Sequence, residues 1–263
     1  MPAYPEHAYA DTTEIDIAVR AISIGDVFDA LSKGAADFWR HPSHYLFVAL
    51  VYPLVGIVIA VWSAEGSTFP LLYPLATGFA LVGPIAAIGL YELSRRRELG
   101  EDDSPRHALE VLNHPSIGAM ILVGLLLAIV FTLWIASAGA IYEAHFPTNP
   151  PATLMALLNE TFTTARGWSL LIWGNAVGLI FALIVLATTA IAFPLLVDKG
   201  GTAARAVTTS LQAFRTNPIP MLVWGVLVAV ILLVASIPLF VGLTIALPIL
   251  GHATWHLYRK TTD

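Results

Sequence analysis

The sequence predicts an all-α, polytopic membrane protein in which six transmembrane helices form three hairpins, each preceded by a short cytoplasmic interfacial helix. Three observations predict this fold: long apolar stretches, basic residues confined to alternate gaps between them, and a proline-containing unit that occurs three times. The chain has 263 residues, 57% hydrophobic and only 12% charged, with a mean hydropathy of +0.76. A soluble domain usually has about 25% charged residues. The chain therefore has too little polar surface to cover a water-soluble domain of its size.

Residues 1–22 are polar and acidic, and they lack the basic start and apolar run of a signal peptide. Their charged residues are Glu6, Asp11, Glu14, Asp16 and Arg20. We expect residues 1–22 to form a flexible acidic cytoplasmic tail and residues 23–263 to form a single six-helix membrane domain. The sequence contains no cysteine, which excludes disulfides, iron–sulfur clusters and thiol nucleophiles.

Six apolar stretches are long enough to cross a hydrocarbon core of about 30 Å, which takes about 20 residues. They are Tyr45–Trp62, Pro70–Leu93, Ile117–Tyr142, Trp168–Val197, Ile219–Ile237 and Leu239–Leu257. The last two run together, and a single helix of that length would rise about 60 Å, twice the thickness of the core. We therefore expect a tight turn near Ser236 and Pro238 that makes them a hairpin.

Basic residues occupy only alternate gaps between these stretches. Twelve of the thirteen fall on one side, namely Arg20, Lys33, Arg40, Arg95, Arg96, Arg97, Arg106, Lys199, Arg205, Arg215, Arg259 and Lys260. The other side has Arg166 alone. Because short loops rich in Lys and Arg stay in the cytoplasm, we expect the amino and carboxyl termini both to be cytoplasmic.

A unit of one short helix, an X-Pro break and a two-span hairpin occurs three times, in residues 23–98, 104–199 and 202–260. The breaks are at Pro42, Pro115 and Pro218, and the second span of each unit contains Pro84, Pro194 or Pro248. The residue before a proline is pushed out of the α region, so the chain turns there. Proline itself suits the first position of the next helix. The alternative, that X-Pro starts are common and the threefold pattern arose by chance, stays open.

The first short helix is predicted for Ser23–Trp39. Its apolar face is formed by Phe28, Leu31, Ala35 and Phe38, and Ser23 with Asp26 forms a capping box. Such a helix is typical of the membrane interface.

The loop Glu143–Gly167 is the only long one on the side opposite the basic residues. A helix after Asn149-Pro150-Pro151 would put Leu154, Leu157, Leu158 and Phe162 on one face. We expect this helix to lie on the membrane surface or to cap the bundle.

No Asp, Glu, Lys or Arg falls inside a predicted span, and Glu92 lies at the inner edge of the second. Proton- and ion-coupled carriers normally need such intramembrane groups. Asn175 is the clearest polar side chain within a span, and a helix–helix hydrogen bond accounts for it. Carriers that use backbone carbonyls at broken helices remain an alternative, since each second span contains a proline.

Candidate contacts for lipid or a partner are the aromatic and basic residues at the predicted inner interface: Trp39, Arg40, Arg95, Arg96, Arg97, Trp255 and Tyr258. His252 and His256, four residues apart, face one way on a helix and are weak candidates for a metal or haem. No third ligand accompanies them at a fixed spacing, so we expect no metal and no cofactor. No catalytic motif is visible, so we expect no enzyme.

Three segments, Pro74–Pro84, Gly89–Arg96 and Pro248–Arg259, resemble the signature stretches of a bacterial membrane protein family, domain of unknown function 2189. The resemblance extends from about Ile22 onward and implies an inner-membrane location, but no activity and no functional residues. Members of the family are sometimes labelled as a cytochrome c oxidase subunit. No histidine is predicted at mid-membrane, where the catalytic subunit holds its haems and copper, so the label implies at most an accessory association with a respiratory complex.

Three functional hypotheses follow. The first is a non-catalytic accessory or scaffold subunit that binds lipid or other membrane proteins, such as a respiratory complex. The second is a carrier or channel for a small neutral or amphipathic molecule, with a cavity at the level of Pro84, Pro194 and Pro248. The third is a histidine-based haem or metal protein that uses His252 and His256. The expected partners are the lipid bilayer and other membrane protein subunits, and no nucleic acid is expected.

Overall fold

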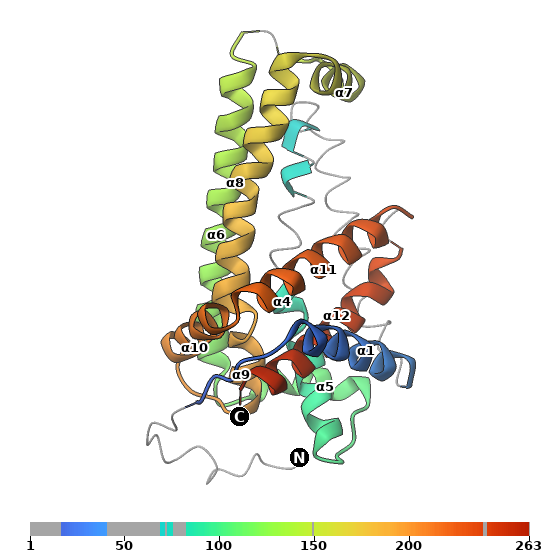
Figure 1. Ribbon diagram of the computed structural model, residues 1–263, viewed down its shortest axis with the longest axis vertical. Helices are drawn as coiled ribbons and strands as arrows, with labels where there is room; N and C mark the ends of the chain where they lie inside the picture. Colours follow the sequence, from blue (N-terminus) through green and yellow to red (C-terminus); the bar gives the residue numbers. More distant parts are fainter. Residues whose placement is uncertain are drawn as a thin grey trace. The chain divides into compact units, whose positions relative to one another are not determined.

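The structure is a computed structural model that describes residues 17–40, 69–71, 73–75, 83–148, 150–238 and 241–262 (Figure 1). Its regular elements are all helices, and one isolated antiparallel bridge pairs Val19 with Thr262. The predicted all-α class is confirmed for this part of the chain. These residues form two compact units: unit 1 comprises 17–40, 83–126, 186–238 and 241–262, and unit 2 comprises 69–71, 73–75, 127–148 and 150–185.

Three helical segments are long and apolar enough to cross a membrane. They are α6 (Ile117–His145), α8 (Ala165–Thr189) together with α9 (Ala192–Asp198), and α11 (Pro218–Ser236). These candidates coincide with the predicted third, fourth and fifth spans. Helix α11 ends at Ser236 and a turn follows at Ile237 and Pro238, where the sequence predicts a turn.

The other three predicted spans are not established as spans. The first, Tyr45–Trp62, lies outside the described residues, and the second, Pro70–Leu93, is described only in part. In place of the sixth, α12 (Leu243–Thr261) begins four residues later and continues to Thr261. Most of its carboxyl-terminal half is buried in unit 1, so its apolar composition reflects protein packing as well as any membrane contact.

Helix α6 is apolar on opposite faces. One face is buried and consists of Met120, Val123, Leu127, Val130, Trp134 and Ala138. The opposite face is exposed and has Ile121, Leu122, Leu125, Ile129 and Leu133. A helix of a soluble protein would have a polar outer face, so this pattern is typical of a helix surrounded by lipid or by other apolar helices.

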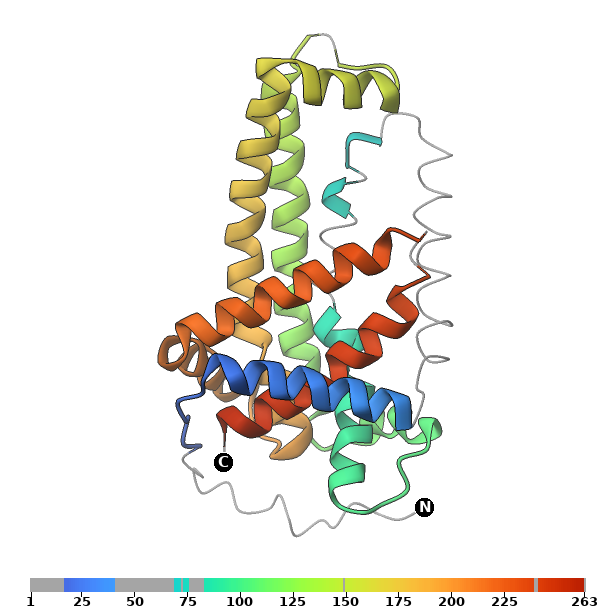
Figure 2. The same ribbon diagram turned by 45° about the vertical axis from the view of Figure 1, so that its right-hand side comes forward.

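Unit 1 contains the three short helices that the repeat predicts: α1 (Ile24–Arg40), η3 (Pro105–Asn113) and α10 (Ala203–Thr216). The helices at the ends of the three predicted repeats are α5 (Ile88–Glu98), α9 and α12. Each short helix packs on the last helix of the preceding repeat: η3 on α5, and α10 on α9. The first short helix, α1, packs along α12, the last helix of the chain (Figure 2). The packing order is therefore cyclic, and the threefold repeat stays a prediction.

The core of unit 1 forms where α5, α9 and α12 contact one another. Phe193, Leu196 and Trp255 are fully buried there. Two glycines permit the close helix contacts: a Cβ on Gly34 of α1 would lie 2.4 Å from the backbone nitrogen of Ala253, and a Cβ on Gly251 would lie 2.3 Å from Leu90 Cδ1.

Residues 17–23, the described segment before α1, form hydrogen bonds with the rest of unit 1. Arg20 N donates to Thr261 O at 2.8 Å, and the Asn217 side chain accepts from Ile22 N and donates to Arg20 O. The predicted capping box is confirmed, since Asp26 N donates to Ser23 Oγ and Ser23 N donates to Asp26 Oδ2.

In unit 2, α6 and α8 contact each other through Trp134. A Cβ on Gly178 would lie 3.1 Å from the Trp134 ring, which also packs against Phe181. Trp134 Nε1 donates to Pro74 O at 2.9 Å, and Tyr73 Oη donates to Asn175 Oδ1 at 2.8 Å. The hydrogen bond predicted for Asn175 is thus present.

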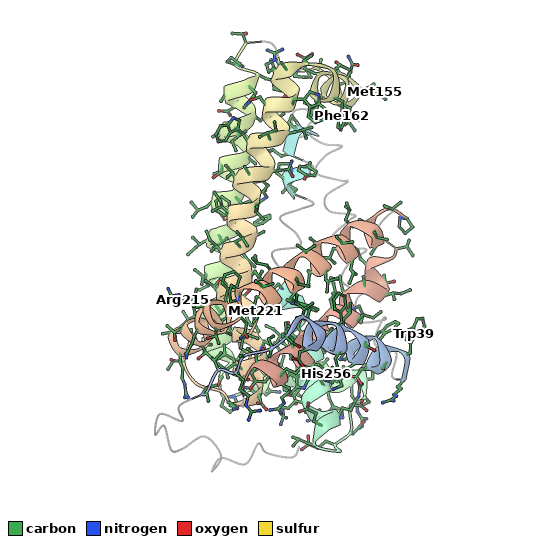
Figure 3. The ribbon with its side chains drawn as sticks, in the orientation of Figure 1. Trp39, Met155, Phe162, Arg215, Met221 and His256 are labelled. Atoms are coloured by element: carbon green, nitrogen blue, oxygen red, sulfur yellow. The ribbon has the colours of Figure 1, made fainter. Side chains whose placement is uncertain are left out.

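Two shorter elements complete unit 2: η2 (Phe69–Leu71) and α7 (Leu154–Thr163), which contact each other. Helix α7 begins at Thr153, whose hydroxyl accepts from Ala156 N, and it exposes Met155 and Phe162 (Figure 3). The predicted helix in the loop Glu143–Gly167 is therefore present, with an apolar edge exposed as expected for a membrane surface.

Candidate functional site

The densest group of buried polar side chains lies where α1, α5 and α12 meet in unit 1. Asp37 of α1 is only 8% exposed. Its Oδ2 accepts from His256 Nε2 at 2.7 Å, and its Oδ1 forms an ion pair with Arg97 Nη1 at 3.2 Å. Burial alone would raise the pKa of Asp37, but the hydrogen bond from His256 and the Arg97 charge outweigh it and hold the pKa below its ordinary value. Asp37 is therefore an ionised group held inside the protein.

His252 lies one turn before His256 on α12, in a part of the chain outside the three candidate spans. It is 0% exposed, and its Nδ1 lies 2.8 Å from Ser94 Oγ. Burial, helped by the nearby Arg97 charge, lowers the pKa of His252 to about 4. The two histidines thus differ: His252 is neutral and bound to a hydroxyl, whereas His256 is bound to a carboxylate.

Glu92 of α5 is fully buried and is paired with two arginines of the same helix. Arg95 binds it through two hydrogen bonds of 2.9 Å, and Arg96 Nε donates to it at 3.0 Å. Arg96 also pairs with Glu110 of η3. The two-point contact of Arg95 with Glu92, which is strong and geometrically specific, lies within α5, whereas the Arg96–Glu110 pair joins α5 to η3.

The acidic loop between α5 and η3 folds back onto neighbouring cations. Arg97 Nε binds Asp103 at 2.8 Å, and Asp102 accepts from Arg106 at 2.6 Å and lies 3.0 Å from His107. The hydrogen bond from Arg106 is the main reason that the pKa of Asp102 lies below its usual range. The loop that follows the three arginines therefore neutralises charge within the chain.

The carboxyl-terminal turns of α12 form hydrogen bonds with side chains of α9 and α5. Arg259 donates to Asp198 at 2.9 and 3.1 Å and to Glu98 at 2.8 Å, while Tyr258 Oη donates to Asp198 at 2.6 Å. Burial, and the adjacent Asp198 carboxylate, raise the pKa of Tyr258.

Lys260 forms the link from α12 to the start of α1. Its ammonium lies 2.8 Å from Asp26 and 2.9 Å from Asp29. These hydrogen bonds raise the pKa of Lys260 above its ordinary value.

The predicted lipid- or partner-contact residues divide into three groups. Trp39 is 70% exposed and projects from the end of α1, and Arg40 beside it is also exposed (Figure 3). The three consecutive arginines of α5 are engaged with acidic residues of the same chain, as described above. Trp255 and Tyr258 are 0% exposed, so neither reaches the surface of unit 1, and the contact predicted for them is corrected.

The predicted break prolines occupy different local positions. Pro115 lies between η3 and α6, Pro218 is the first residue of α11, and Pro84 lies in the four-residue helix α4 (Gly83–Ala86). Pro194 lies in α9, just after a turn at Ala190 and Ile191, whereas Pro248 lies inside α12 without ending it. Pro42 lies outside the described residues.

No group of three or more His, Asp or Glu side chains that could hold a metal occurs among the described residues. His252 and His256 are each within hydrogen-bond distance of a protein side chain, Ser94 and Asp37. This arrangement holds five helices together through paired charges, of which Asp37 and Glu92 are buried.

Sequence reasoning missed the long-range partners of this site, chiefly the acidic Asp37 and Asp198 and the hydroxyl of Ser94. Asp198 and Ser94 gave no local signal, since their partners are far away in the sequence.

Comparison with known proteins shows a similarity to one protein family. Residues 71–198 match a family described as predicted integral membrane protein (DUF2189). No curated protein and no solved structure matches the chain.

Proposed function

We propose that this chain, whose residues 71–198 match a family of predicted integral membrane proteins (DUF2189), is a non-catalytic, multi-pass protein of the bacterial inner membrane that binds other membrane proteins as an accessory subunit. In this proposal the chain has six spans and cytoplasmic termini. A respiratory complex is one kind of assembly that it would join.

The apolar surface left exposed on the long helices carries this proposal. Only 28% of the most apolar window of α6 and 17% of that of α11 is buried within the chain, against 56% for the segment Ala165–Asp198. Exposed side chains on α11 include Val226, Val230 and Leu233. Such faces need lipid or partner helices around them, and helix pairs in membranes associate by packing apolar faces of this kind.

The distribution of charge supports the proposed orientation. Twelve of the thirteen basic residues belong to unit 1, and Arg166 alone belongs to unit 2. Under the positive-inside rule, the basic unit lies on the cytoplasmic side. Its cations mostly pair with acidic residues of the chain, which suits a structural role better than catalysis.

The carrier alternative has less support. Pro194 and Pro248 are both buried, and the helices that contain them pack against each other in a dense core. That packing favours a closed scaffold at this level over the cavity predicted there. The haem or metal alternative lacks a third ligand beside His252 and His256 among the described residues.

The test is a pull-down of the tagged protein, expressed at its native level and extracted in mild detergent, followed by mass spectrometry and an absorbance spectrum. A stoichiometric membrane complex in the eluate is expected. A lone, colourless protein would overturn the accessory role, and a haem band would favour the third hypothesis.

Two variants sharpen this test. Val230→Trp on α11 and Ile129→Trp on α6 enlarge exposed apolar positions that lipid accommodates but a tightly packed partner helix does not. We expect at least one of them to lose the partner while the melting temperature stays unchanged. If both retain it, lipid and not protein covers these two faces.

A further inference from the structure

The three short helices of unit 1 share a pattern that their different sequences do not suggest. In each of them, a residue buried against the neighbouring helix is followed directly by an apolar residue that is exposed or half-exposed. The pairs are Val27–Phe28, Ala30–Leu31, Gly34–Ala35 and Phe38–Trp39 in α1; Ala108–Leu109 and Val111–Leu112 in η3; and Ala206–Val207, Ser210–Leu211 and Ala213–Phe214 in α10. We call the second members of these pairs the outer stripe of each helix.

The outer stripes are substantial. Phe28 is 51% exposed, Trp39 70%, Leu109 65% and Leu112 64%. One residue turns an α-helix by about 100° and a 3₁₀-helix by about 120°. The apolar face of each short helix is therefore about twice as wide as the part that packs on the neighbouring helix. The other half of that face, the outer stripe, stays exposed in unit 1.

The displacement has the same sense in all three helices. Each outer stripe lies one residue toward the carboxyl terminus from the buried stripe, and each helix packs on the equivalent helix of the preceding repeat. Because each short helix packs on a helix at the end of a predicted repeat, we expect the same displacement to turn the three outer stripes toward one side of unit 1. A chance distribution of exposed apolar residues would not give one common direction.

We propose that the three outer stripes lie in the inner leaflet of the membrane, so that α1, η3 and α10 form a collar of in-plane helices embedded at the headgroup–acyl boundary. The occupant of this surface is lipid. The inference requires only that the chain is membrane-inserted, and it is independent of the accessory role proposed above.

Chain continuity favours lipid over a soluble partner. The η3 helix ends at Asn113 and α6 begins at Ile117, where the exposed apolar face that includes Ile121 and Leu122 starts. Helix α10 ends at Thr216 and α11 begins at Pro218, with Ile219 63% exposed. The outer stripes thus lead directly into helix faces that require an apolar environment.

The polar faces agree with this orientation. On α1 the exposed ion pair between Lys33 and Asp29 lies about 150° around the helix from the outer stripe, and on α10 the exposed Gln212 is similarly removed. Exposed Trp39 at the end of α1 has the ring type that prefers headgroup depth. An amphipathic helix of this kind buries its apolar side roughly 5–10 Å below the headgroups.

The absence of cysteine allows a direct test. Single variants Phe28→Cys, Leu109→Cys and Phe214→Cys on the outer stripes are compared with Lys33→Cys, Asn113→Cys and Gln212→Cys on the same helices. The full chain is spin-labelled and reconstituted in vesicles of phosphatidylethanolamine and phosphatidylglycerol. Collision rates are then measured by electron paramagnetic resonance with oxygen, which is lipid-soluble, and with a water-soluble nickel chelate.

The expected result is a several-fold higher oxygen-to-nickel collision ratio at each stripe position than at the control on the same helix. Equal ratios would overturn the proposal in favour of a water-exposed stripe. Low collision rates with both reagents would overturn it in favour of a protein contact, such as a second copy of the chain. Where a stripe variant does not fold, Leu31→Cys, Leu112→Cys or Leu211→Cys tests the same stripe.

Discussion

The contact between Gly34 and Ala253 predicts that one methyl group is enough to release α1 from α12. A Cβ at position 34 would lie 2.4 Å from a backbone nitrogen and 2.6 Å from the Ala253 Cβ. Ordinary contacts between such atoms begin about 1 Å further apart, and a backbone atom has no rotamer by which to move away. The helices must therefore separate in Gly34→Ala.

The magnitude follows from two opposing effects. Forcing an extra methyl group into a packed contact costs about 1–3 kcal/mol, and a clash with backbone belongs at the upper end of that range. Replacing glycine by alanine within a helix stabilises the helix by about 0.5–1 kcal/mol. The net loss of docking free energy is then about 2 kcal/mol, which raises the undocked population of α1 about thirtyfold.

The reactivity of a cysteine placed on the buried face of α1 measures the undocked population. Val27 is fully buried against α12, and Val27→Cys provides the only cysteine of the chain. We expect maleimide to label this thiol about thirtyfold faster when Gly34→Ala is added.

Gly25→Ala on the same helix is the matched control, because the nearest atom to its added Cβ is Ser23 Oγ at an ordinary 3.4 Å. It should leave the labelling rate unchanged or lower it. Equal labelling rates in the Gly34→Ala and Gly25→Ala proteins would refute the argument, since a close contact between α1 and α12 would then have no energetic consequence.

Three further predictions concern buried charge. Asp37→Asn should lower the free energy of unfolding by about 3 kcal/mol because Arg97 loses its counter-ion and His256 loses its carboxylate partner, whereas the exposed Asp29→Asn should cost well under about 1 kcal/mol. Thermal unfolding in detergent compares the two variants. The pKa of Asp37 lies below its ordinary value, so the ionised carboxylate stabilises the folded state fully above about pH 4. That stabilisation is lost as the pH falls through the pKa of the folded state. The melting temperatures of the native protein and of Asp37→Asn should therefore converge in acid. Glu92→Gln should lower the free energy of unfolding by about 3–5 kcal/mol because Arg95, which is mostly buried, loses its carboxylate partner. Glu101→Gln should leave the free energy of unfolding nearly unchanged. Equal effects of the two variants would show that burial does not determine how much an ion pair stabilises this protein.

The sequence predicted those features that depend on local pattern. The third, fourth and fifth spans follow from length and hydropathy, and the short helices follow from capping residues and X-Pro breaks. The capping box of Ser23 and Asp26 is local in the same way. Hydrophobic periodicity and proline sterics act within a few residues, so one sequence is enough to detect them.

The candidate site depends on contacts that no local pattern contains. His256 and Asp37 are 219 residues apart, and Lys260 and Asp26 are 234 apart. Arg95, Arg96 and Arg97 were predicted to contact lipid because of their charge, but their acidic partners within the chain could not be identified from the sequence. Trp255 was placed at the interface because its ring type favours that depth, yet its neighbours cover it completely.

The packing of the first helix on the last has a consequence for how the protein is made. During synthesis, α1 emerges first but has no α12 to pack on until some 219 further residues have been added. At roughly 5–20 residues per second, that interval is on the order of 10–45 s. For that time the buried face of α1, with Val27, Gly34 and Phe38, is without its partner. The contact between α1 and α12 therefore forms only after the whole chain between them has been synthesised.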